Sequence, residues 1–110
     1  MKLKKALIKA LEAADFTINI DDESIRFQKY SPEGQDFFFV ISATGSLTDI
    51  FNSIYDYYDG FDPSEEAYLW LDNSGHGKHG APYDMGDVYQ DMVVCKGYIK
   101  EAAEIVRSFL

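Results

Sequence analysis

The chain has 110 residues, of which 46% are hydrophobic and 15% aromatic, and its formal net charge is −9. This length predicts one domain over residues 1–110, and the composition is too apolar for a disordered acidic tail. The single cysteine, Cys95, excludes an internal disulfide and a cysteine-based zinc site. No apolar run is long enough to span a membrane, so we expect a cytoplasmic protein.

The first part of the chain has the periodicities of one helix followed by three strands. Residues 2–14 place leucines and alanines on one face of a helix. Alternating apolar and polar residues then predict strands over 16–20, 25–30 and 36–42. Short turn sequences join them, which favours an antiparallel meander. The continuous apolar run Phe37–Ile41 indicates a third strand that is covered on both faces or awaits a partner on one.

The second part of the chain predicts three helices. Ser46 with Asp49 forms a capping box, and Gly60 ends that helix. Asp62–Pro63 marks a second helix start, and Asp84 a third. The fold class is therefore α+β, in the order α-β-β-β-α-α-α. The core expected to join sheet and helices consists of Ile18, Phe27, Phe37, Phe39, Phe51, Ile54, Trp70, Leu71, Val88 and Met92.

Negative charge is concentrated in the middle of the chain. Residues 15–91 carry sixteen of the nineteen acidic side chains and a net charge of −13, whereas both ends are mildly basic. Because burying an unpaired carboxylate costs several kcal/mol, we expect these groups at the surface. An acidic surface disfavours direct contact with nucleic acid or an anionic membrane. It serves either solubility or the attraction of a basic protein partner.

The residues expected to bind such a partner are acidic side chains on the polar helix faces, together with one tyrosine. Tyr57 falls beside Asp56, whereas Tyr55 and Tyr58 fall on the apolar stripe. An exposed tyrosine among carboxylates can stack on an arginine. If the helices lie side by side, these groups merge into one ridge. The full set is Asp49, Asp56, Tyr57, Asp59, Asp62, Glu65, Glu66, Asp84, Asp87 and Asp91.

Three other features carry weaker chemical signals. The segment GHGKHG at 75–80 matches G-x-G-x-x-G, but it lacks the preceding strand and the later acidic residue of a dinucleotide site. His76 and His79 could ligate a metal, yet no third ligand stands at a fixed spacing. Cys95, on an apolar helix face, is typical of a buried thiol. We expect no catalysis, no cofactor and no metal, with a metal- or ligand-binding loop at His76 and His79 as an alternative.

Three segments carry a resemblance that covers roughly residues 24–96: KYSPEGQDF (29–37), YDGFDPSEEAYLWLD (58–72) and GAPYDMGDVYQDM (80–92). They resemble a widespread group of short acidic proteins of gut-type bacteria and their phages or mobile elements. The group has no established activity and supplies no catalytic residues. The resemblance implies a mobile-element setting, in which small acidic proteins can inhibit DNA-binding defence enzymes.

Two broad functions follow from the sequence. The first is a non-enzymatic interaction protein that binds a basic protein surface, with a DNA mimic or anti-defence inhibitor as its narrower form. The second is a small accessory domain whose acidity serves solubility alone. That domain would be a monomer, or a homodimer through the open face of the third strand.

Overall fold

One antiparallel sheet and four helices make up the described residues, 3–74 and 85–110, of the computed structural model. This arrangement confirms the predicted α+β class and element order. In these ranges no helix is both long and apolar enough to cross a membrane. The elements are α1 (Lys5–Ala13), β1 (Thr17–Ile20), β2 (Ser24–Tyr30), β3 (Asp36–Ser42), α2 (Leu47–Gly60), α3 (Pro63–Ser74) and α4 (Met85–Arg107).

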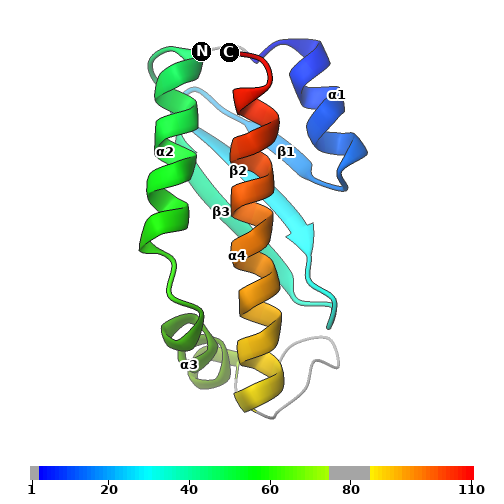
Figure 1. Cartoon of the computed structure of the whole chain (residues 1–110), viewed down its shortest axis with the longest axis vertical. Coiled ribbons are helices and arrows are strands. Elements are labelled where there is room, and N and C mark those ends of the chain that lie inside the picture. Colours follow the sequence, from blue (N-terminus) through cyan, green and yellow to red (C-terminus); the bar gives the residue numbers. More distant parts are fainter. Residues whose placement is uncertain (1–2, 75–84) are drawn as a thin grey trace.

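The sheet has the strand order β1-β2-β3, as a meander requires. Ile18 of β1 pairs with Phe27 of β2, which in turn pairs with Phe39 of β3. Helix α4 crosses one face of this sheet. Helices α1 and α2 flank α4, one on each side of it (Figure 1). Helix α3 lies beyond the sheet, at the opposite end of the molecule from the two termini (Figure 1).

The core lies between α4 and the inner face of the sheet. The Phe27 and Phe39 rings stack there with centroids 4.7 Å apart, and Phe16 meets Phe27 edge-on. Among the expected core residues, Ile18 and Phe51 are only half-buried, and the side chains of Trp70 and Leu71 lie outside the described set. The confirmed members, all buried, are Phe27, Phe37, Phe39, Ile54, Val88 and Met92.

The outer face of the sheet is open. Phe38 and Val40 of β3 point to this face and are 47% and 43% exposed, and the Arg26 guanidinium lies 4.3 Å from the centre of the Phe38 ring. Of the two alternatives for the apolar run in β3, a strand covered on both faces is therefore wrong. The run reflects one packed face and one solvent-facing face.

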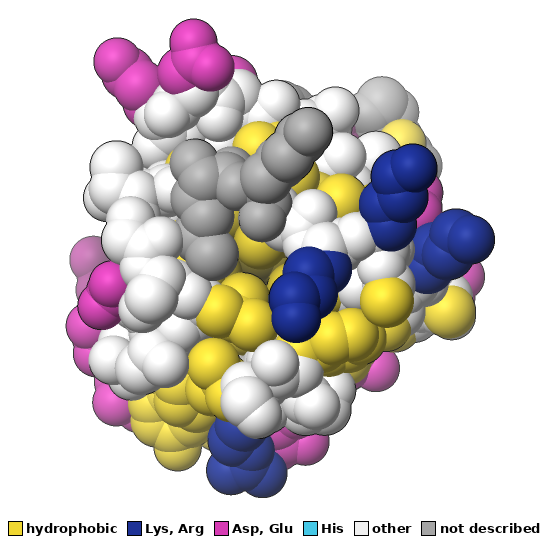
Figure 2. All heavy atoms as spheres, turned by 90° about the horizontal axis from the view of Figure 1, so that it is seen from above, with side chains coloured by type: hydrophobic (Ala, Val, Ile, Leu, Met, Phe, Trp, Pro, Cys, Tyr) yellow, Lys and Arg dark blue, Asp and Glu magenta, His cyan; other side chains and the backbone are white. Residues whose placement is uncertain are grey.

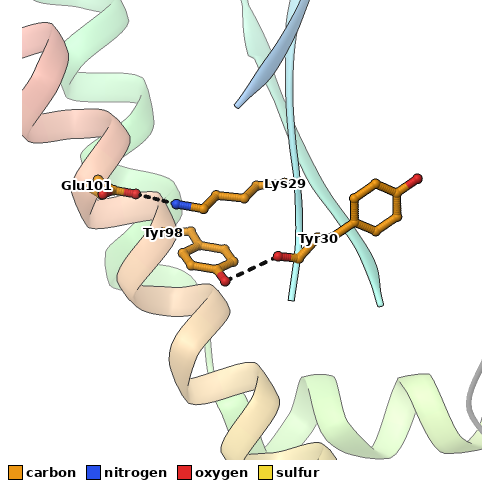
Figure 3. Close-up of polar contacts among 4 residues, drawn as sticks. All are labelled: Lys29, Tyr30, Tyr98 and Glu101. Atoms are coloured by element: carbon orange, nitrogen blue, oxygen red, sulfur yellow. Dashed lines mark hydrogen bonds and ion pairs between the residues drawn. The ribbon is translucent and has the colours of Figure 1, made fainter. Parts of the chain in front are cut away.

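A half-buried cation links β2 to α4 (Figure 3). Lys29 Nζ lies 2.9 Å from Glu101 Oε1 and 4.3 Å from the centre of the Tyr98 ring. The Tyr98 hydroxyl donates a hydrogen bond of 3.2 Å to the carbonyl oxygen of Tyr30. These contacts connect α4 to the sheet, and they pair the half-buried Lys29 charge with the more exposed Glu101 carboxylate.

Candidate functional site

Charged side chains lie at both ends of the molecule. Lys4, Lys5 and Arg107 stand near the helix ends beside the two termini, where Asp49 also lies at the start of α2, and Figure 2 shows both basic and acidic side chains on this end. At the other end α2 stops, α3 lies across and α4 begins (Figure 1). That end carries the set we call the acidic end: Asp56, Asp59, Asp62, Glu65 and Glu66.

The junction between α2 and α3 fixes the acidic end to the core. Phe61, which directly follows α2, is buried, and its ring meets the Phe37 ring edge-on with centroids 5.8 Å apart. Its carbonyl oxygen accepts a hydrogen bond of 2.8 Å from Lys96 Nζ of α4. Asp62 then caps α3, since its Oδ1 accepts a hydrogen bond of 3.0 Å from the Ser64 amide. The helix start predicted at Asp62–Pro63 is confirmed.

Three of the predicted binding residues line one hollow at this junction. Asp56, Tyr57 and Glu66 surround a cavity of about 180 Å³, together with Gly60 and Phe61. We call it the acidic hollow. The Tyr57 ring lies 5.3 Å from the Phe39 ring and 6.5 Å from the Phe61 ring, yet Tyr57 remains 39% exposed. The prediction that Tyr57 is exposed is confirmed, and its ring forms an aromatic wall beside two carboxylates.

Negative charge accumulates in the acidic hollow without neutralisation. Partial burial raises the pKa of the Glu66 carboxyl, and the nearby Glu65 and Asp62 carboxylates raise it further. Burial also raises the pKa of Tyr57, with a second contribution from the Glu66 charge. Within the part of the chain that the structure describes, none of the acidic-end carboxylates forms an ion pair with Lys or Arg. A cation placed here from outside would relieve this repulsion.

Changing Glu66 to Gln should raise stability at neutral pH and leave it unchanged in acid. Since the folded-state pKa of Glu66 is raised, its contribution to stability is complete below the unfolded-state pKa and is lost as pH rises through the folded-state value. Denaturant unfolding of both proteins at about pH 3 and about pH 7, on either side of the ordinary range for Glu, measures this. Glu104→Gln, on an exposed part of α4, is the control. A Glu66→Gln effect of equal size at both pH values would contradict the electrostatic cause.

Other predicted binding residues are dispersed or undescribed. Asp49 is exposed but belongs to the capping box of α2, at the far end from α3. Hydrogen bonds from the Ser46 amide and hydroxyl lower the pKa of the Asp49 carboxyl. Asp87 is exposed near the start of α4, and Asp84 lies outside the described residues. Asp56 also borders a second hollow, of about 510 Å³, to which Arg107 contributes.

The prediction for Asp91 is wrong. Its side chain is 3% exposed and accepts hydrogen bonds from the Ser31 hydroxyl at 2.5 Å and the Glu33 amide at 3.2 Å. Asp91 thus binds the β2–β3 turn to α4. The signal for this was present, because Asp91 lies three residues after Val88 and four before Cys95, on the same helix face. The carboxylates therefore do not form the single ridge expected from the sequence, because Asp91 is buried and Asp49 lies at the far end of α2.

The remaining residues singled out in the sequence are two tyrosines of α2, the cysteine and the two histidines. Tyr55 was expected in the core and is instead 40% exposed, whereas Tyr58 is half-buried. Burial raises the pKa of the Cys95 thiol, and the neighbouring Asp91 charge raises it further. His76 and His79 lie outside the described residues. Among the described side chains, no three His, Cys, Asp or Glu residues gather as metal ligands would.

Known proteins do not identify the site. No family model, curated protein or solved structure matches the chain. The resemblance to the short acidic proteins stays a prediction from the three sequence segments, and the function has to be argued from the geometry of the acidic end.

Proposed function

We propose that this chain is a non-enzymatic interaction protein whose acidic end binds a basic surface on a protein partner. The observation that carries the proposal is the acidic hollow, which Asp56, Tyr57 and Glu66 line together, and where partial burial, and then the Glu65 and Asp62 charges, raise the pKa of Glu66. Arginine suits this site, because its guanidinium can pair with a carboxylate while stacking on the tyrosine ring. The surrounding exposed acids add attraction at longer range.

The positions of the charges favour recognition over solubility alone. Carboxylates that served only solubility would do so from any part of the surface, whereas five of them gather around one helix junction. The opposite end, by contrast, carries basic and acidic side chains together (Figure 2). The concentration of carboxylates at one junction attracts a basic partner to that place and speeds association at low ionic strength.

The test is the salt dependence of binding to a fluorescently labelled, Lys-rich helical peptide. Affinity should fall steeply between about 50 mM and about 300 mM salt, because screening lengths shorten over that range. Changing Asp56, Asp59, Glu65 and Glu66 together to Asn or Gln should weaken binding at least about tenfold, which is about 1.4 kcal/mol. The domain should stay folded, because these side chains are exposed or half-exposed.

The chain offers a charge-matched control. Glu12, Asp22, Glu23 and Glu104 are also exposed acids and lie away from the acidic end. Neutralising these four removes the same net charge, and peptide affinity should change far less than in the acidic-end variant. Equal weakening by both variants would mean that only total charge matters. That result would favour the second candidate, an accessory domain with solubilising acidity.

A DNA mimic is the narrower form of the proposal, in which the basic surface is the DNA-binding site of the partner. Competition between this protein and duplex DNA for a basic nuclease tests whether the protein is a DNA mimic. A DNA mimic releases duplex DNA from a basic nuclease, and the acidic-end variant does so less well than its charge-matched control. A partner that holds DNA and this protein together excludes the mimic and leaves the broader proposal standing.

A further inference from the structure

Another hollow lies on the other side of α3, between that helix and the start of α4. Its volume is about 340 Å³. Ser64, Ala67 and Tyr68 share one face of α3 and form one wall, since residues three and four apart are neighbours on a helix. Met85, Gly86 and Tyr89 form the other wall. We call it the apolar hollow, because carbon-rich side chains dominate both walls.

The rim of the apolar hollow is an exposed apolar surface. Tyr68 is 64% exposed and Tyr89 is 36% exposed, although both also line the hollow. Val93 follows Tyr89 by one helical turn and is 40% exposed. Apolar groups gathered around a concavity mark interaction sites more often than apolar groups scattered singly.

Charge and backbone geometry restrict what the apolar hollow can receive. Glu65 is exposed beside Ser64, and Asp62 caps the same helix, so acids border the apolar surface. An anionic ligand or membrane would be repelled, whereas a cationic apolar ligand is attracted. Both walls are helices and neither is a strand, so the hollow offers no sheet edge to which an extended peptide could add. The occupant must satisfy its own backbone, as a helix does.

We propose that the apolar hollow receives one large apolar side chain from a basic amphipathic helix of the protein partner. This inference rests on the proposed function and names the partner class. The partner's Lys and Arg residues contact the acidic end, and its apolar face covers Tyr68 and Tyr89. Helix α3 is then the centre of the interface, with the acidic hollow on one side and the apolar hollow on the other.

The experiment compares two synthetic Lys-rich helical peptides that differ only in having Phe or Ala at the centre of the apolar face. The wild-type protein should bind the Phe peptide about tenfold more tightly than the Ala peptide, because the ring is buried in the hollow. Ser64→Phe fills the hollow from an exposed position and should abolish this preference. Thr48→Phe, exposed at the start of α2, is the matched control and should keep it.

The acidic-end variant separates the two proposals. It should weaken both peptides by the same factor, because it removes charge and leaves the apolar hollow intact. Tyr68→Ala is a second hollow variant that should fold, given the exposure of Tyr68, and it should reduce the Phe preference. Salt-sensitive binding with no Phe preference overturns this inference alone. Binding of either peptide that ignores salt and the acidic-end variant overturns the proposed function.

Discussion

Replacing Phe39 by alanine should lower the free energy of unfolding by about 3–5 kcal/mol, the range for a large buried ring. Phe39 is 1% exposed and stacks on Phe27 at an interplanar angle of 3°. It also contacts Phe37 and the Tyr57 ring of α2. Removing the ring leaves a cavity where the sheet, the core and the acidic hollow meet. Chemical denaturation at neutral pH measures the loss.

The adjacent residue on the same strand is the control for this prediction. Phe38→Ala removes an identical ring from the open face, where the side chain is 47% exposed, and should cost less than about 1 kcal/mol. Most of that small loss would come from the contact with the Arg26 guanidinium. Equal losses for Phe38→Ala and Phe39→Ala would contradict the assignment of inner and outer faces in β3.

Changing Asp91 to alanine should destabilise the protein by about 2 kcal/mol, because two hydrogen bonds to a buried carboxylate are lost together. The Ser31 hydroxyl and the Glu33 amide would then lose their acceptor. The Ser31 oxygen itself accepts a hydrogen bond of 2.9 Å from the Gln35 amide, so the contact with Asp91 holds the β2–β3 turn against α4. Urea denaturation of the variant provides the measurement.

Asp56→Ala serves as the comparison for Asp91. Asp56 is exposed on a helix, and its loss should change stability by no more than about 0.5 kcal/mol. If Asp91→Ala also proved neutral, the carboxylate would not be structural. Asp91 would then again be a candidate for binding a partner.

Local periodicity was enough to predict the elements of the fold. Strand β3 begins and ends where alternation predicted, at Asp36 and Ser42, and the capping box of α2 forms at Ser46 and Asp49. These features depend on residues close in sequence, whose patterns are direct consequences of strand and helix geometry. Side-chain burial was less predictable, as Tyr55 shows, because it depends on how much of each helix face a neighbouring helix covers.

The candidate site could be predicted only in part. The sequence identified the acids and Tyr57 as a group, but the meeting of Tyr57 with Glu66 depends on the angle between α2 and α3. That angle is set by the buried Phe61 and by the contact between its carbonyl oxygen and Lys96, which lies 35 residues away in sequence. Asp91 was expected at the surface because it is charged, although its spacing from Val88 and Cys95 puts it on the buried face of α4. The apolar hollow was missed because its walls come from two helices.

The most direct test of the central claim is nuclear magnetic resonance mapping of the Lys-rich peptide on isotopically labelled protein at low salt. The account predicts that the perturbed backbone amides cluster in residues 56–69 and 85–93, at the acidic end and around the apolar hollow. They should return toward their free positions as salt is added. Perturbations confined to the open face of the sheet, or spread evenly over exposed acids throughout the chain, would contradict it.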